Sequence, residues 1–306
     1  MKKTRLVAFF MCLALLMGTF ALTSCDTRKP SQGFAYEVNE DGKSCTITGM
    51  GTCVDTALIF PSQIDGYTVT AIAERAFWEQ KDITEIDISD SVTTVGQFAF
   101  ASCSNLKTVT IPKSATVFSE GVFVKDEAIE VVYYEGDLVD WCGIQFAESF
   151  SSPLASLAEP DLYFGNWLVS DETEITIPDS VTEIGSYSFS LFRNVTKINL
   201  PDGLTNIPDG AFRACKSLAE VTIPESVTSI GNRAFGGCAA LQKLYIPVTV
   251  TSIDQNAFAL FSSVANIEFE GTVEQWHAVY PTYDGMSVFV VHCSDGDAIY
   301  SPMLQK

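Results

Sequence analysis

Apolar and polar residues alternate in short stretches that return at a constant spacing through most of the chain. Six of these stretches share one phase: IDISDSVTTVGQFAF (86–100), VTIPKSATVFSEGVF (109–123), ITIPDSVTEIGSYSF (175–189), INLPDGLTNIPDGAF (198–212), VTIPESVTSIGNRAF (221–235) and LYIPVTVTSIDQNAF (244–258). A first, partial copy lies at 67–77. The period is 23 residues, which is typical of a repeat architecture.

Each period predicts two short strands and a turn. The Val/Ile-x-Ile-Pro stretch alternates as a half-buried strand does, and the proline ends it because proline cannot donate a ladder hydrogen bond. The Ser-Val-Thr-x-Ile stretch predicts a second short strand, and the Ala-Phe pair then begins a helical or irregular segment. Seven phenylalanines recur in one register: Phe77, Phe100, Phe123, Phe189, Phe212, Phe235 and Phe258. Because one repeat cannot bury this face alone, neighbouring repeats must stack.

These residues resemble the leucine-rich repeats of the BspA-like bacterial surface-protein family. The phrase IPxSVTxIGxxAF carries the resemblance, which extends over residues 58–293. It implies a right-handed leucine-rich-repeat solenoid of 23-residue repeats, mainly β with short helical or irregular segments, and a parallel strand ladder on one face. About ten rungs at about 4.8 Å would make a ladder near 50 Å long.

The period is interrupted over residues 135–174. VVYYEGDLVDW (131–141) in this region is matched by NIEFEGTVEQW (266–276), so Trp141 and Trp276 each follow a Glu-Gly pair. We expect both tryptophans in the core, planted there by a short helix, rather than on a surface that binds carbohydrate. The segment LYFGNWLV (162–169) predicts a hairpin around Gly165-Asn166.

Both ends of the solenoid need covering, because an unpaired strand edge is an aggregation template. Residues 33–57 predict a capping hairpin that turns at Glu40-Asp41-Gly42. SVFVVHCSDGD (287–297) predicts a last strand and a polar exit. Residues 294–306 are expected to form a C-terminal tail.

The first 24 residues predict a lipoprotein signal peptide. Lys2, Lys3 and Arg5 precede an uncharged apolar run that ends in Leu22-Thr23-Ser24-Cys25, which looks like a bacterial lipobox. Cys25 would then carry two acyl chains, enough for stable anchoring. Residues 25–32 would form a short tether, which places the protein outside the cell, on the outer face of a bacterial membrane.

Composition excludes several classes of function. The chain has 38 acidic and 18 basic residues, a net charge of −20, which argues against binding nucleic acid. Neither of the two histidines, His277 and His292, lies in a recognisable catalytic or metal motif, and we expect both to be structural or surface residues. The NEDGK and SDGD turns lack the ligand spacing of calcium loops. We therefore expect no cofactor, no metal and no enzymatic activity.

The cysteines outside the predicted leader give little indication of a catalytic or metal site. The seven that remain after Cys12 and Cys25 are Cys45, Cys53, Cys103, Cys142, Cys215, Cys238 and Cys293. We expect free core thiols, since a buried cysteine behaves as a small apolar residue. Disulfides between Cys45 and Cys53, or between Cys215 and Cys238, remain open because spacing alone does not establish the geometry.

Strand alternation predicts which side chains point outward from the ladder. If Ile86 and Ile88 point inward, their neighbours Glu85 and Asp87 point to solvent. The same phase gives the candidate binding face: Glu85, Asp87, Thr108, Thr110, Val131, Tyr133, Glu174, Thr176, Lys197, Asn199, Glu220, Thr222, Lys243, Tyr245, Asn266 and Glu268. Varied residues on a rigid ladder are typical of the extended binding surfaces of solenoids.

The leading hypothesis is a lipid-anchored, non-enzymatic surface protein whose repeats bind another macromolecule. The resemblance implies binding to a host or bacterial surface protein, as in adhesion. A second hypothesis is a glycan-binding lipoprotein that uses the tyrosines and the two Trp motifs. These two are separated by whether Trp141 and Trp276 are buried. A hydrolase is a third hypothesis, which only the abundance of carboxylates favours.

Overall fold

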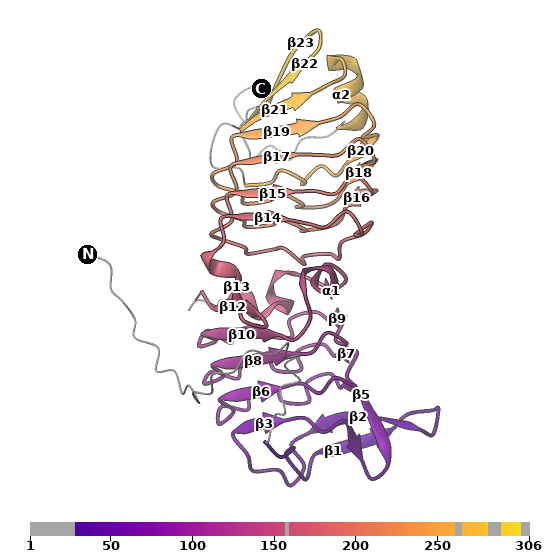
Figure 1. Cartoon of the computed structure of the whole chain (residues 1–306), viewed down its shortest axis with the longest axis vertical. Coiled ribbons are helices and arrows are strands. Elements are labelled where there is room, and N and C mark those ends of the chain that lie inside the picture. Colours follow the sequence, from indigo (N-terminus) through magenta and orange to yellow (C-terminus); the bar gives the residue numbers. More distant parts are fainter. Residues whose placement is uncertain (1–27, 157–158, 261–264, 281–288, 301–306) are drawn as a thin grey trace, which may run out of the picture.

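The computed structural model describes residues 28–156, 159–260, 265–280 and 289–300, which form a β-solenoid (Figure 1). Strands of successive turns stack along the long axis, with one row of strands on each of two sides. In the regular turns, paired strands lie 23 residues apart, as in Glu85 opposite Thr108, which confirms the predicted repeat. The predicted leader and Cys25 lie outside the described residues.

The first ladder contains five parallel strands and one antiparallel strand. Its order is β3 (Ala57–Ile59), β6 (Glu85–Asp87), β8 (Thr108–Ile111), β10 (Val131–Tyr134), β12 (Asp161–Phe164) and β13 (Trp167–Leu168). The β12–β13 pair is the hairpin expected around Gly165-Asn166, and Gly165 takes a φ of 57° there. Its antiparallel strand ends this ladder.

The second ladder begins again beyond the hairpin. It runs β14 (Glu174–Thr176), β15 (Lys197–Asn199), β17 (Glu220–Thr222), β19 (Lys243–Ile246), β21 (Ala265–Phe269), β22 (Phe289–Cys293) and the antiparallel β23 (Gly296–Tyr300). The single ladder expected from the repeat is therefore two ladders, because β13 and the 3-10 turn η3 (Val169–Asp171) lie between them.

The second strand of each turn forms the opposite side of the solenoid. β5 (Tyr67–Ile72), β7 (Thr94–Val95), β9 (Val117–Phe118) and β11 (Gln145–Phe146) are continuous, whereas β16 (Asn206–Ile207), β18 (Ser229–Ile230) and β20 (Ser252–Ile253) form a separate sheet. At the equivalent position of other turns, Gly96 and Gly231 donate an N–H to the preceding turn. Proline at 208 has no N–H to donate there, which explains why the pairing resumes only at β16.

The seven repeating phenylalanines occupy the interior, as predicted. All are at most 3% exposed, and their rings stack in two runs with centroids 5.3–6.4 Å apart. The runs are Phe77–Phe100–Phe123 and Phe189–Phe212–Phe235–Phe258. Offset stacking adds to the free energy of apolar burial, so each ring is stabilised by the ring of a neighbouring turn, and Phe100, Phe212 and Phe235 by one on each side.

The turn before six of the seven stacked phenylalanines, all except Phe258, uses a left-handed backbone. The residue two positions earlier has a φ of 62° at Gly121 and 60° at Gly210, but also 55° at Phe98 and 57° at Tyr187. The Phe98 ring lies over Gly121, where an added Cβ would come within 2.3 Å of it, and Tyr187 lies likewise over Gly210. Glycine at these positions therefore supplies the conformation and the space for the previous turn's ring.

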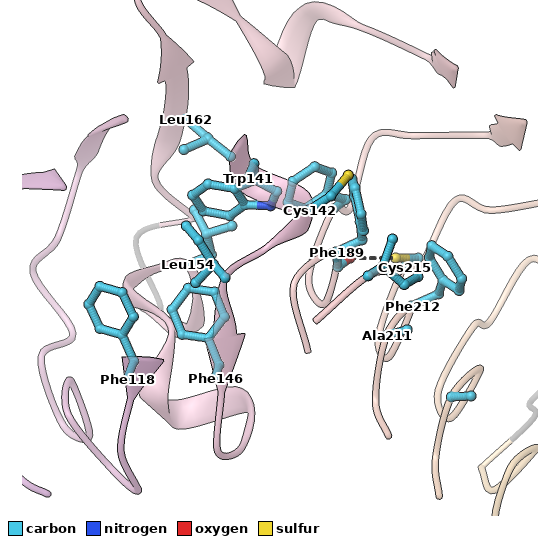
Figure 2. Close-up of a cluster of buried hydrophobic side chains, with 14 of the residues drawn as sticks. Phe118, Trp141, Cys142, Phe146, Leu154, Leu162, Phe189, Ala211, Phe212 and Cys215 are labelled. Atoms are coloured by element: carbon cyan, nitrogen blue, oxygen red, sulfur yellow. Dashed lines mark hydrogen bonds between the residues drawn. The ribbon is translucent and has the colours of Figure 1, made fainter. Parts of the chain in front are cut away.

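Trp141 joins the two phenylalanine runs across the irregular stretch. It lies on the short helix α1 (Leu138–Cys142), is 0% exposed and contacts Phe146, Phe164 and Phe192 at centroid distances of 6.0, 5.3 and 6.2 Å. Its indole N–H donates to the Ser188 carbonyl at 2.7 Å. The 3-10 turns η1 (Ser149–Ser151) and η2 (Pro153–Ala155) follow, and Leu154 completes this cluster (Figure 2).

Trp276 is likewise a core residue on a short helix, near the C-terminal end of the solenoid. It lies on α2 (Val273–Val279), is 0% exposed, and donates its indole N–H to the Tyr300 hydroxyl at 3.0 Å. Tyr300 in turn stacks on Phe289 with centroids 4.8 Å apart. Residues 296–300, expected within a polar tail, are therefore the strand β23, because their apolar side chains cover the last turn.

The N-terminal end is closed by the predicted hairpin. β1 (Ala35–Val38) and β2 (Ser44–Gly49) are antiparallel, and β2 extends the sheet of β5, as does the short β4 (Gln63–Ile64). Residues 28–32, expected to be tether, lie against the solenoid instead. The Ser31 N–H donates to the Ile59 carbonyl at 2.8 Å, so this segment satisfies part of the open edge of β3.

We predict that the phenylalanine stack dominates stability. Phe212→Ala removes a ring that contacts both neighbouring turns, and should lower the free energy of unfolding by about 3–5 kcal/mol. Phe150→Ala is the matched control, since this ring is 50% exposed. Chemical denaturation measures both. Equal losses for the two variants would show that the stack carries no special weight.

Candidate functional site

The outward-facing residues of the ladder strands are here called the ladder face. Inner positions such as Ile86, Val132 and Leu244 are fully buried, while the predicted outward residues are exposed or half-buried, so the predicted alternation is confirmed. Thr110 is the exception at 9% exposed. It lies in register between Asp87 and Tyr133, whose larger side chains flank it.

The ladder face has two parts because the ladder itself is divided. Glu85, Asp87, Thr108, Thr110, Val131 and Tyr133 belong to the first ladder, and the remaining predicted residues belong to the second. The predicted row is therefore carried by two separate ladders on the same side of the solenoid (Figure 1).

Charges alternate along one column of the second part. Glu174, Lys197, Glu220 and Lys243 follow one another in register, and Lys197 Nζ lies 3.2 Å from Glu174. Asn199 also donates to Glu174, at 2.8 Å, and this bond, together with Lys197, lowers the pKa of that carboxyl. Opposite charges on neighbouring strands stabilise the ladder modestly, so this column has a structural role of its own.

The adjoining column is hollowed. Thr222, Tyr245 and Glu268 line a groove of about 440 Å³, which continues past Asp202 and Pro224 into a smaller one of about 160 Å³. Glu225 and Glu270 also line the larger groove. This surface is acidic, with one partly exposed aromatic ring at its centre.

Two further strands, β12 and β22, contribute outward residues to the ladder face. The repeat pattern did not identify these residues. In β12, Asp161 and Tyr163 point outward, and Tyr163 lies opposite Tyr133. In β22, His292 lies opposite Glu268, and its Nδ1 is 2.9 Å from Asp297. The buried Leu162 and Phe164 give the alternation that could have located the first pair, but β12 lies inside the interrupted stretch.

One part of the ladder face is already occupied by the chain itself. The Arg28 guanidinium forms ion pairs with both Glu85 and Asp87, which are neighbours on the outward side of β6. Its Nη2 lies 2.7 Å from Asp87 Oδ2. These two predicted residues are therefore partly covered by the segment that precedes the fold.

The cysteines of the described ranges form no disulfide, as expected for core thiols. All seven described cysteines are free, and Cys103, Cys215 and Cys238 donate their S–H to the phenylalanine carbonyl of the preceding turn at 3.2, 3.1 and 3.1 Å. Burial raises the pKa of Cys103 and Cys215 to about 12. Such thiols stay protonated at neutral pH and are poor nucleophiles.

Asp126 occupies the repeat position that holds a cysteine in three other turns. It is 2% exposed, and the Cys103 N–H donates to its Oδ1 at 2.7 Å. Among the described residues its Oδ2 has no hydrogen-bond partner. Burial raises the pKa of this carboxyl to about 8. It neighbours a buried thiol and no groove, which favours a structural role over a catalytic one.

Metal and membrane features are limited in the described part of the chain. Within it, no three His, Cys, Asp or Glu side chains are grouped so that they could hold a metal ion. His277 is exposed on α2. No helix of the described ranges is long and apolar enough to cross a bilayer.

The repeat unit identifies the protein class as a leucine-rich-repeat solenoid. The family model described as "BspA type Leucine rich repeat region" matches six copies over residues 57–149 and 168–279. The chain therefore belongs to this family and is a repeat scaffold. No curated protein matches the sequence.

Solved bacterial structures show similarity at low identity. The Treponema pallidum leucine-rich repeat protein is 24% identical over 70% of this chain and 90% of its own, with a TM-score of 0.45. A leucine-rich repeat protein of Bacteroides ovatus is 19% identical over 78% of this chain and 64% of its own, with a TM-score of 0.49. The pneumococcal vaccine antigen PcpA is 18% identical over 89% and 83%, with a TM-score of 0.46.

We predict that Asp126 destabilises the protein as the pH rises. Its folded pKa of about 8 exceeds the ordinary value of 3.8, so the folded state holds a proton that the unfolded state releases between these values. Stability from this group is therefore complete below about pH 4 and is lost progressively up to about pH 8. Asp126→Asn should stabilise the protein by roughly 1–3 kcal/mol at pH 8 and hardly at all at pH 4.

Denaturant unfolding at both pH values checks this expectation. Asp82→Asn, at an exposed position two turns earlier, is the control for loss of one carboxylate. A gain for Asp126→Asn that is the same at pH 4 and pH 8 would contradict the assignment.

Proposed function

We propose that this protein is a non-enzymatic scaffold, displayed outside the cell, whose ladder face binds another protein. The observation that carries the proposal is the groove lined by Thr222, Tyr245 and Glu268, since these outward residues lie on strands whose inner side chains are fully buried. A rigid backbone that presents varied side chains is suited to binding a large surface without ordering cost.

The chemistry of the described residues supports binding over catalysis. The buried ionisable groups include thiols with raised pKa values, Tyr134 and Asp126, and none of these lines the grooves described above. The carboxylates at the grooves are charged surface groups suited to attracting a basic partner. A glycan ligand loses the support of Trp141 and Trp276, because both are core residues, and retains only the tyrosines.

Display outside the cell is part of the same proposal. The leader of residues 1–24 and the lipobox ending at Cys25 support export and a lipid anchor on the outer face of the membrane. Removing the leader takes away three basic residues and leaves 15 against 38 acidic ones. The resulting excess of negative charge favours solubility beside an anionic membrane.

Capture of a partner tests the binding role. The full chain, solubilised in detergent, is immobilised and exposed to surface extracts of bacterial and host cells. Thr222→Arg fills the groove with a long cation and should reduce the captured protein about ten-fold, as loss of a central contact does.

Ser229→Arg is the matched control, because Ser229 lies in the same repeat on β18, at the opposite side. It should leave capture unchanged. Equal loss for the two variants, or retention of no macromolecule by the unaltered chain, would contradict binding at the ladder face.

The anchor has an independent test. Cys25→Ala removes the only thiol that the lipobox could acylate, so the protein should leave the membrane fraction and appear in the soluble fraction. Cell fractionation with immunodetection measures this, with Cys45→Ala as a control thiol substitution. An unchanged distribution for Cys25→Ala would refute lipidation at this residue.

A further inference from the structure

An exposed pair of tyrosines lies on the first ladder, away from the groove. Tyr133 and Tyr163 are opposite each other on β10 and β12, with ring centroids 5.3 Å apart and planes inclined by 31°. Tyr133 is 42% exposed. The protein buries its phenylalanine stacks and the tryptophans of α1 and α2, whereas this aromatic pair stays open to solvent.

Two carboxylates, Asp161 and Asp171, lie near the pair. Asp161 precedes Tyr163 by two residues and points to the same side of β12. Burial raises the pKa of the Tyr163 phenol, and the negative charges of Asp161 and Asp171 raise it further. The nearby cation Arg193 forms an ion pair with Glu159, with Nε 3.7 Å from Oε1. The π-faces and the carboxylates both favour a positive group.

The same side of this ladder already binds a guanidinium group. Arg28 lies between Glu85 and Asp87, and Asp87 belongs to the same column as Tyr133, with Thr110 between them in register. The residues that hold Arg28 are an outward pair two positions apart on one strand. Asp161 and Tyr163 repeat that arrangement, with an aromatic ring in place of the second carboxylate.

We infer that the Tyr133–Tyr163 pair, with Asp161, receives an arginine from an extended basic segment of the partner protein. This rests on the proposed function and specifies the chemistry of the partner. The planar guanidinium lies on the two rings, and its N–H groups donate to Asp161. The net charge of −20 favours such a segment over a second copy of this chain or an anionic lipid surface.

A peptide-binding measurement tests the inference. The probe is a dye-labelled peptide of alternating threonine and arginine, and its binding to the full chain in detergent is followed by fluorescence anisotropy. Two matched peptides carry citrulline, which is planar and neutral, or lysine, which is charged without a planar group. We expect the arginine peptide to bind about ten-fold more tightly than either.

Variants locate the site. Tyr133→Thr combined with Tyr163→Thr removes both rings, places β-branched residues that suit strands at these positions, and should weaken binding of the arginine peptide about ten-fold. Val117→Thr is the control, since Val117 is 41% exposed on β9 of the opposite sheet. Unchanged thermal unfolding of each variant verifies the fold.

Three results would overturn the inference. Lysine and arginine peptides that bind equally would indicate general attraction to an acidic protein. Binding that survives the double tyrosine substitution would place it elsewhere. Tighter binding of neutral oligosaccharides than of the arginine peptide, lost in the double variant, would make this a glycan site. A partner captured at the groove despite any of these results would leave the proposed function standing.

Discussion

Each turn of this solenoid can bury its phenylalanine only against the turns beside it. The stacked runs from Phe77 to Phe123 and from Phe189 to Phe258 express this constraint, with centroid separations of 5.3–6.4 Å. Other features follow from it: left-handed turns that make room for the ring, thiols that donate to the phenylalanine carbonyls, and the end hairpins. Where the run of phenylalanines stops, Trp141 continues the core and bonds to the next half. Stability is therefore the sum of contacts between neighbouring turns.

The repeat made most of this architecture predictable from sequence. A 23-residue period of β-branched residues, proline and phenylalanine determines which side chains face inward, and the buried Ile86, Val132 and Leu244 agree with it. The division of the ladder could not be predicted from the repeat, because the β12–β13 hairpin lies where the 23-residue period is interrupted. Strand β23 and the contacts of Arg28 and Ser31 were missed for another reason. This strand and these contacts depend on which polar and apolar groups are left uncovered at the two ends of the solenoid. The repeat period carries no information about those groups.

The candidate site follows the same division. Strand alternation identified Thr222, Tyr245 and Glu268, which the structure brings together at one groove. It did not identify Tyr163 or Asp161, whose strand lies outside the period. Alternation also does not reveal that Glu174 and Lys197 form an ion pair across neighbouring strands. Nor does it reveal that Glu85 and Asp87 form ion pairs with Arg28. Of the outward residues, those without such partners are the better candidates for contact with another protein. A rigid acidic scaffold of this kind would select a partner by charge and aromatic contact and would not require conformational change.

The most direct test of this account is the footprint of a captured partner on the full chain. Amide hydrogen exchange, measured with and without the partner, reports which strands become protected. We expect protection in β10, β12, β17, β19 and β21, the ladder strands that carry the tyrosine pair and the groove. Protection confined to β7, β9, β16, β18 and β20 would contradict the assignment of function to the ladder face.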